Sequence, residues 1–149
     1  MDKKEYQKKY KIIKDKGKLS CSDDIEFERV QVANDIFNMG YKGNSFQKAG
    51  LPVPRGEKLS KEMLWLPKLT HKDWENTVLN DGNTIHSKYK GNNKKQKIHT
   101  DFDENIKVYT FAQHTGERLY KFIGVFKCIK RENLTWTYEK ISDELKLPI

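Results

Sequence analysis

Cysteine is scarce in this sequence, and the two cysteines that it has form no binding pattern. Cys21 and Cys128 stand far apart among 149 residues and belong to no Cys-x-x-Cys motif. A zinc site with four cysteine ligands is therefore excluded, and a disulfide scaffold is not expected. We predict that both thiols are reduced.

Long apolar stretches are also missing. The first five residues, Met1 to Glu5, contain no apolar core of the kind that a signal peptide requires. No segment approaches the roughly 18 consecutive apolar residues of a membrane-spanning helix. The sequence therefore predicts a cytoplasmic protein that makes no contact with a membrane.

The motifs of several reaction classes are absent. The sequence has no Gly-x-x-x-x-Gly-Lys-Ser/Thr phosphate loop, no Gly-x-Ser-x-Gly nucleophile turn and no His-Glu-x-x-His zinc helix. We therefore assign no catalytic residue, no metal site and no cofactor. Histidines and acids do occur in the C-terminal half, at spacings typical of surface residues: His86, His99, His114, Asp101 and Asp103.

A small metal-dependent nuclease stays open as an alternative. Such an enzyme needs clustered carboxylates and a lysine near the scissile phosphate, to hold Mg²⁺ and to stabilise developing charge. Asp101, Asp103 or Glu144 would supply the carboxylate, and Glu144 begins the acid-x-lysine triplet Glu144-Leu145-Lys146. The triplet lies near the C-terminus and outside any predicted strand, which weighs against the nuclease.

Arginine is rare, whereas lysine is abundant. The chain has four arginines and 25 lysines, a formal net charge of +8 and a pI of about 9.3. Positive charge of this size draws phosphate polyanions to the surface. Lysine is a flexible point charge that suits contact with a nucleic-acid backbone, while arginine suits base reading. The balance favours a nucleic-acid partner, and a coding sequence poor in G and C is the competing explanation.

The N-terminal part, residues 1–40, is predicted to be helical. Tyr6, Tyr10 and Ile13 share one face at helical spacing, in a lysine-rich helix that ends near Gly17. A second helix is expected from Asp23 to Met39, where acids follow a serine-containing cap and apolar residues form a stripe.

The C-terminal part, residues 60–141, is predicted to be rich in strands. Gly124 interrupts one of these strands and indicates a bulge. A loop is expected over 41–58, either as a plain surface connection or as a segment that is functional or partly strand-like, and a short helix after 70–73 is expected to carry Trp74. A turn signal occupies 80–83, the apolar cluster at 60–69 is expected in the core, and alternation predicts strands over 84–89, 106–113, 119–129 and 134–141.

Helices followed by antiparallel strands indicate an α+β fold. We expect one domain over residues 1–149, in which N-terminal helices pack on a curled antiparallel sheet or a partly open β-barrel. A chain of this length can bury about 70% of its unfolded surface, so its core can stabilise the fold without disulfide bonds or bound metal ions.

Aromatic side chains among polar and basic residues suggest a pocket for a nucleobase. Stacking on an aromatic ring holds an unstacked base, and polar groups are needed to read its Watson–Crick edge. We predict a base pocket formed by Trp65, Trp74, Asn76, Asp81 and Tyr89. In the alternative interpretation, both tryptophans anchor the core.

The basic loop over 88–97 is the predicted contact with the nucleic-acid backbone. Its ammonium groups would track the phosphates, although a solvated hairpin loop explains the same residues. The lysines expected to make this contact are Lys88, Lys90, Lys94, Lys95 and Lys97.

The C-terminal half resembles PUA-like and SRA-like β-barrel domains of modification-dependent restriction systems. The likeness extends from Trp65 to Ile141 and is centred on the pattern Tyr120-x-Phe122-x-Gly124. The resemblance implies a curled barrel, a pocket for a flipped modified cytosine, and DNA as the partner. The segments that carry it are Val108–Gln113 (VYTFAQ), Leu119–Phe126 (LYKFIGVF), Trp136–Ile141 (WTYEKI), Trp74-Glu75-Asn76 and Thr84-Ile85-His86.

The leading hypothesis is a DNA-binding module of a restriction or phage-defence system that reads modified cytosine in duplex DNA. We expect it to be fused to, or associated with, a nuclease domain. Its lysines are expected on one side of the sheet, beside a cleft floored by indole rings. A phage- or plasmid-encoded inhibitor of a host protein is a further alternative.

Overall fold

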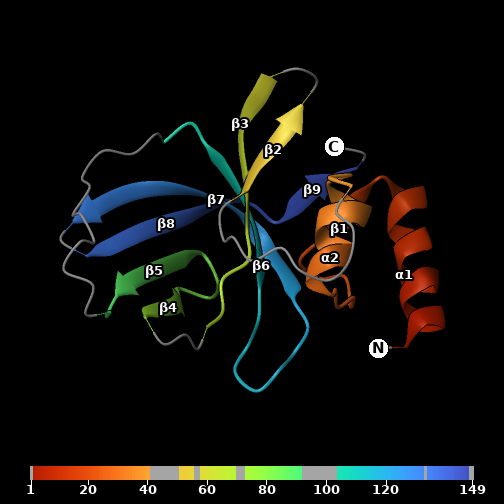
Figure 1. The fold of residues 1–149 in the computed structure, drawn as a ribbon, viewed down its shortest axis with the longest axis horizontal. Helices are drawn as coiled ribbons and strands as arrows, with labels where there is room; N and C mark the ends of the chain where they lie inside the picture. Colours follow the sequence, from red (N-terminus) through yellow and green to blue (C-terminus); the bar gives the residue numbers. More distant parts are fainter. Residues whose placement is uncertain are drawn as a thin grey trace.

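Figure 1 shows the computed structural model of the chain, with helices at one end and most strands at the other. The structure describes residues 2–40, 51–55, 58–69, 73–91, 104–132 and 134–147, with the backbone alone given for 51–55 and 58–61. Within this part of the chain, every helix is too short or too polar to span a bilayer. Several predictions lie outside it: the loop at 41–50, the cap at 70–72, and Lys94, Lys95, Lys97, His99, Asp101 and Asp103.

The first helix confirms its prediction closely. Helix α1 (Lys3–Lys16) begins after Asp2, whose side chain accepts a hydrogen bond from the Glu5 amide at 2.8 Å. It ends at Gly17, which adopts a left-handed φ of 76° and donates its N–H to carbonyls of the last turn. The apolar face on Tyr6 and Ile13 is buried.

The second predicted helix, over 23–39, is wrong in its first third. Phe27 exchanges two backbone hydrogen bonds with Tyr120, at 2.9 and 2.8 Å, which keeps this segment extended. Helix α2 (Arg29–Gln31) therefore begins only after Glu28, and continues as a π-helical turn, η1 (Val32–Ile36). Local sequence favoured a helix, but pairing with a distant strand prevails.

One seven-stranded sheet forms the body of the structure, in the order β2-β3-β6-β7-β8-β5-β4. Neighbouring strands are antiparallel except β3 and β6, which are parallel, whereas a wholly antiparallel sheet was expected. A separate pair, β1 (Lys18–Ser20) and β9 (Glu144–Lys146), was not predicted. The bounds are β2 (Leu51–Arg55), β3 (Lys58–Trp65), β4 (Trp74–Leu79), β5 (Thr84–Tyr89), β6 (Lys107–Ala112), β7 (Lys121–Glu132) and β8 (Thr135–Ser142).

The four alternating segments are strands, as predicted, but the short helix at Trp74 is wrong. Trp74 opens strand β4, because it pairs with Tyr89 across the β4–β5 hairpin. The turn signal at 80–83 is confirmed, and Asn80, Asp81 and Gly82 all have positive φ there.

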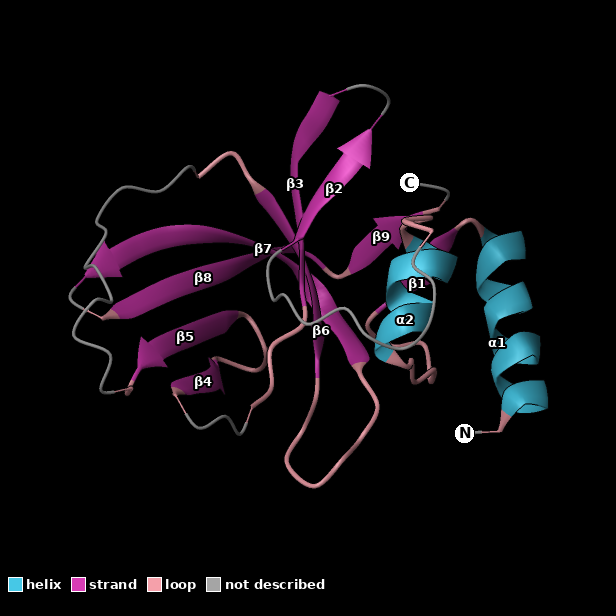
Figure 2. Ribbon diagram, in the orientation of Figure 1, coloured by secondary structure: helices cyan, strands magenta, loops and turns pink. Residues whose placement is uncertain are grey.

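The sheet curls without closing, so its two faces cover two separate apolar clusters. One face packs against α1, α2 and η1, with Phe27 meeting Phe111 edge-on at a centroid distance of 5.6 Å. Figure 2 shows these helices gathered at one end of the sheet. The other face lies on the inside of the curl. There the ring centroids of Trp65 on β3 and Tyr138 on β8 lie 4.7 Å apart.

A bulge at Gly124 separates the two clusters along β7 and confirms the predicted irregularity. Gly124 has a φ of 137°, and the register with β6 shifts beside it. The extra residue changes which face each later side chain meets. Phe122 therefore joins the cluster under the helices, whereas Phe126, four residues on, joins the inner cluster.

Alanine at Gly124 is predicted to destabilise the fold by about 2–4 kcal/mol. A φ of 137° strains any side chain, and an added Cβ would lie 3.1 Å from Cε1 of the fully buried Phe126 and 2.7 Å from Cε of the flexible Lys140. Gly116→Ala is the matched control, since Gly116 also has a positive φ but no atom within 4 Å of an added Cβ.

We expect the control to lose about 1 kcal/mol in urea-induced unfolding. Equal losses in the two variants would show that neither the wider φ of Gly124 nor its close neighbours, Phe126 and Lys140, add to the cost.

Candidate nucleic-acid interface

The β4–β5 hairpin places an aromatic pair and a polar pair side by side on the inner face of the sheet. Trp74 lies opposite Tyr89, and Asn76 lies opposite Ser87. Alternate residues of a strand share a face, so both pairs point into the curl. The rings of Trp74 and Tyr89 lie 5.1 Å apart between centroids, at 57°.

The polar pair is buried and held in one orientation. Ser87 donates its hydroxyl to Oδ1 of Asn76 at 2.6 Å, and Nδ2 of Asn76 donates to the carbonyl of Lys68 at 2.9 Å. Asn76 is 9% exposed and Ser87 4%. A side-chain amide has two N–H bonds and two acceptor lone pairs, so these contacts use half of its capacity. Asn76 is thus a fixed donor and acceptor beside an aromatic ring.

The aromatic row continues from Trp74 onto the neighbouring strands. Trp136 of β8 meets Trp74 edge-on at 5.7 Å, and the guanidinium of Arg131 lies 3.8 Å from the centroid of Trp136. This is a close cation–π contact in a half-buried setting. Burial raises the pKa of the nearby Tyr138, Cys128 adds to the shift, and Arg131 opposes it, so the Tyr138 hydroxyl remains protonated at neutral pH.

Of the five residues predicted to form the base pocket, three come together. Trp74, Asn76 and Tyr89 share the inner face of the hairpin near its open end. Trp65 lies on β3 and contacts Tyr138 instead, and Asp81 is exposed in the turn at the other end of the hairpin.

Two of the predicted backbone lysines are described, and both are exposed beside Tyr89. Lys88 precedes it on β5, on the opposite face of the strand, and Lys90 follows it. The backbone N–H of Lys90 donates to the carbonyl of Asp73 at 2.7 Å, which ties the ends of the hairpin together.

Sequence reasoning missed Ser87, Arg131 and the part that Trp136 plays in the aromatic row. Their place in the site follows only from the pairing of neighbouring strands. Ser87 of β5 and Arg131 of β7 both lie directly opposite Trp136 of β8. Alternation in the strand over 134–141 indicates in addition that Trp136 lies on a packed face, and the structure shows it half-buried.

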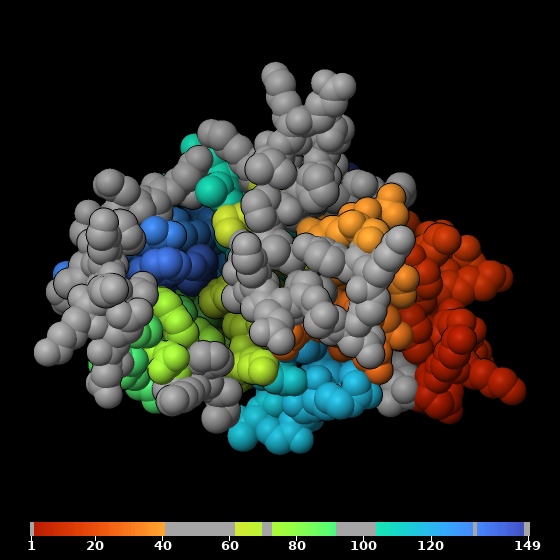
Figure 3. Space-filling model, in the orientation of Figure 1, coloured from red at the N-terminus to blue at the C-terminus, as the bar shows by residue number. Residues whose placement is uncertain are grey.

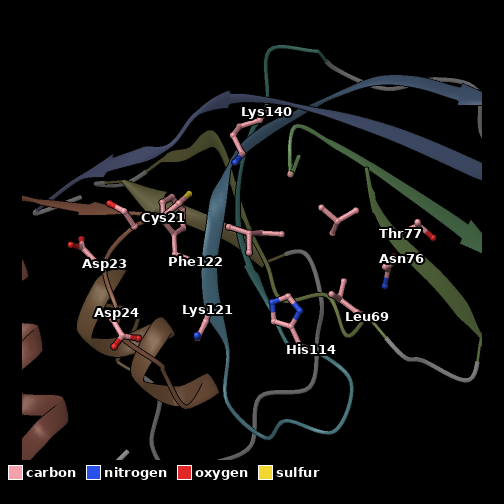
Figure 4. Close-up of a pocket in the computed structure, with 14 residues that line it drawn as sticks. Cys21, Asp23, Asp24, Leu69, Asn76, Thr77, His114, Lys121, Phe122 and Lys140 are labelled. Atoms are coloured by element: carbon pink, nitrogen blue, oxygen red, sulfur yellow. The ribbon is translucent and has the colours of Figure 1, made fainter. Parts of the chain in front are cut away.

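An open cavity of about 730 Å³ lies directly beside Asn76. Figure 4 shows Asn76 and Thr77 on one side of it and Lys121 and Phe122 on the other, with Lys140 above. Its full lining is Cys21, Ser22, Asp23, Asp24, Leu69, Asn76, Thr77, Val78, Gly82, His114, Lys121, Phe122, Ile123 and Lys140. The cavity gives a ligand held at Asn76 room to extend.

The gathering of lysines on one side of the sheet, expected from the sequence, stays a prediction. In the described part of the chain lysines lie on α1 and on strands from β1 to β9. The indoles of Trp65, Trp74 and Trp136 are each half-buried, so none is sealed in the interior.

The alternative of a metal-dependent nuclease finds no centre in the described residues. They contain no group of three or more side chains that could hold a metal ion. Glu144 lies on β9 and forms an ion pair with Lys18 at 3.0 Å, whereas Asp101 and Asp103 lie outside the described residues.

Comparison with known proteins gives matches to a family model and to solved structures. A family model described as SRA, the SET and RING associated domain, matches residues 12–147. A solved structure, that of the 5-hydroxymethylcytosine-specific restriction enzyme AbaSI, is similar with a TM-score of 0.66 at 22% identity. The match covers 94% of this chain and 46% of that one, so this chain spans less than half of that enzyme's length. No curated protein matches the chain.

The Cys21 thiol at the edge of the cavity is predicted to react slowly. Burial raises its pKa to about 11, the Lys140 charge opposes the shift, and Asp143 adds to it. At pH 8 the thiolate fraction is then about 100-fold below that of an ordinary cysteine.

Iodoacetamide alkylation of a Cys128→Ala variant, followed by mass spectrometry, should give a rate that climbs until about pH 11. Cys21→Ser in the same background supplies the blank. A midpoint near pH 9 would contradict the burial of this thiol.

Proposed function

Because the chain belongs to the SET and RING associated (SRA) domain family, we propose that it is a DNA-binding module that recognises modified cytosine. The observation that carries the proposal is the aromatic pair Trp74 and Tyr89 beside the buried amide of Asn76. A ring to stack against and a fixed amide to read the base edge are the two parts that recognition of an extruded base requires.

Each group has a distinct task in this proposal. Stacking of the base on Trp74 contributes about 1–3 kcal/mol. The Asn76 amide donates to cytosine acceptors and accepts from the exocyclic amine, because it presents both a donor and an acceptor. The Ser87 hydroxyl and the Lys68 carbonyl hold that amide in place, which reduces the entropy lost on binding.

The aromatic pair must open if the base enters between its rings. A base sandwiched by two rings needs about 7 Å between their centroids, since each stacked contact takes about 3.5 Å. Tyr89 is 9% exposed, and a Cβ at Gly91 would collide with its ring, so Tyr89 is held tightly. The half-buried Trp74 is the ring that moves, or that offers its outer face.

The cavity beside Asn76 makes a substituted base the preferred ligand. A 5-substituent needs space beyond the ring, and about 730 Å³ of open volume adjoins the amide. The matched enzyme is described as specific for 5-hydroxymethylcytosine, so this base is the first to test. We propose that the module acts in a restriction system with a nuclease, fused or separate, and that Lys88 and Lys90 contact phosphates.

A salt titration with three duplexes of one sequence tests the function. They carry 5-hydroxymethylcytosine, 5-methylcytosine or cytosine at a single position. We predict tightest binding to a modified duplex, and affinity that falls as salt rises. Trp74→Ala should weaken binding to the preferred duplex by about 5- to 150-fold, the equivalent of one lost stacking contact.

Leu79→Ala is the matched control, because Leu79 is exposed on the same strand. Equal affinity for the three duplexes would remove the modified-base proposal. Binding that does not respond to salt would remove the DNA proposal.

A further inference from the structure

Helix α1 is anchored firmly, so the direction of its outer face is set. The hydroxyl of Tyr6 donates to the Asp35 carboxylate and that of Tyr10 to the Asp35 carbonyl, both at 2.7 Å. Tyr6 also meets Phe27 edge-on at 5.9 Å, and Ile13 is 2% exposed. The lysines on the side away from these contacts must therefore face solvent.

The lysines of α1 divide into two sets. On the inner side, Lys9 pairs with Asp24 at 3.4 Å and Lys16 with Asp23 at 2.8 Å. On the outer side, among the described residues, Lys11 pairs with Asp15 at 3.9 Å, and Nζ of Lys14 lies 5.8 Å from the centroid of the Tyr10 ring at the edge of the face. We call the exposed outer set the α1 lysine face: Lys3, Lys4, Lys8, Lys11 and Lys14.

Helix α1 and its cap together carry much of the net charge of the chain. Seven lysines and three acids lie between residues 2 and 16, an excess that is half of the formal +8. The SRA family match begins at residue 12, so four of the five lysines of the face precede it. Figures 1 and 3 show α1 forming the end of the molecule away from β4 and β5, where the base site lies.

The geometry of the face fits a phosphate backbone. Lys3 and Lys14 are eleven residues apart, or about 16 Å along a helix that rises 1.5 Å per residue. Successive phosphates of one DNA strand advance by about 3.4 Å, so the face spans roughly five of them.

We propose that the α1 lysine face is a second DNA contact, which binds the backbone of the same duplex at a distance from the modified base. The proposal rests on the proposed function for its partner. Contacts to phosphates carry no base information, so this face raises affinity for modified and unmodified DNA by the same factor. It also engages only a duplex long enough to reach it.

Duplex length separates this contact from the base site. A domain of this size has a radius of gyration of roughly 15 Å. A duplex of about 12 base pairs centred on the modified base extends about 20 Å to each side, whereas one of about 30 base pairs extends about 50 Å. Only the longer duplex should reach α1.

The test variant carries Lys3→Gln, Lys4→Gln, Lys8→Gln and Lys14→Gln. Glutamine has a helix propensity close to that of lysine, so α1 should persist, which circular dichroism checks. The control removes the same charge from the strands, through Lys107→Gln, Lys127→Gln, Lys130→Gln and Lys146→Gln. Each is titrated with salt against modified and unmodified duplexes of both lengths.

On the longer duplex, the test variant should lower the slope of log affinity against log salt by about 2 or more relative to the control. On the longer duplex, the affinity of the test variant should be at least about tenfold below that of the control, by the same factor for modified and unmodified DNA. On the short duplex, the two variants should bind with equal affinity. A slope equal to that of the control, or an equal loss on both lengths, overturns the inference.

The two proposals fail separately. If the wild-type chain prefers the modified base but α1 has no effect, the inference alone is wrong. If α1 matters but the chain has no preference for modified DNA, the proposed function alone is wrong. A wild-type chain that binds neither duplex refutes both.

Discussion

The cross-strand register of β4 and β5 is the constraint on which the proposed site depends. It sets Trp74 opposite Tyr89 and Asn76 opposite Ser87, and the turn between the strands holds it. Asn80 and Asp81 adopt φ values of 53° and 55° there, which asparagine and aspartate tolerate better than most residues. A slip by one residue would move Trp74 and Asn76 to the outer face and abolish the site.

The rest of the sheet supports this hairpin and divides the molecule between two tasks. Strand β8 pairs with β5 from Thr84 to Lys88, which is nearly the whole of β5. The contact between Trp65 and Tyr138 joins the two sides of the curled sheet. The bulge at Gly124 lets one strand, β7, contribute to both apolar clusters. The helices can therefore cover one end, while the aromatic row lies at the other and the cavity lies between Asn76 and the N-terminal residues Cys21 to Asp24.

Local patterns predicted the elements well, whereas tertiary pairing escaped them. The helical spacing of apolar residues, together with Gly17, predicted α1. The alternation of apolar and polar residues predicted β5 to β8. Phe27 is extended because of Tyr120, a partner 93 residues away, which no local pattern encodes. Of the site, the aromatic and amide types in the hairpin were predictable, since Trp74, Asn76 and Tyr89 stand among polar residues. Ser87 was not, because its relevance comes entirely from facing Asn76.

The central claim is that a cytosine leaves the duplex and stacks at Trp74. A duplex with 2-aminopurine beside the modified cytosine reports this directly, because the fluorescence of that analogue rises when its neighbour unstacks. We predict that fluorescence rises when the wild-type chain binds, and that this rise is lost in Trp74→Ala at saturating protein. Saturated binding of the wild-type chain with no change in fluorescence would contradict it.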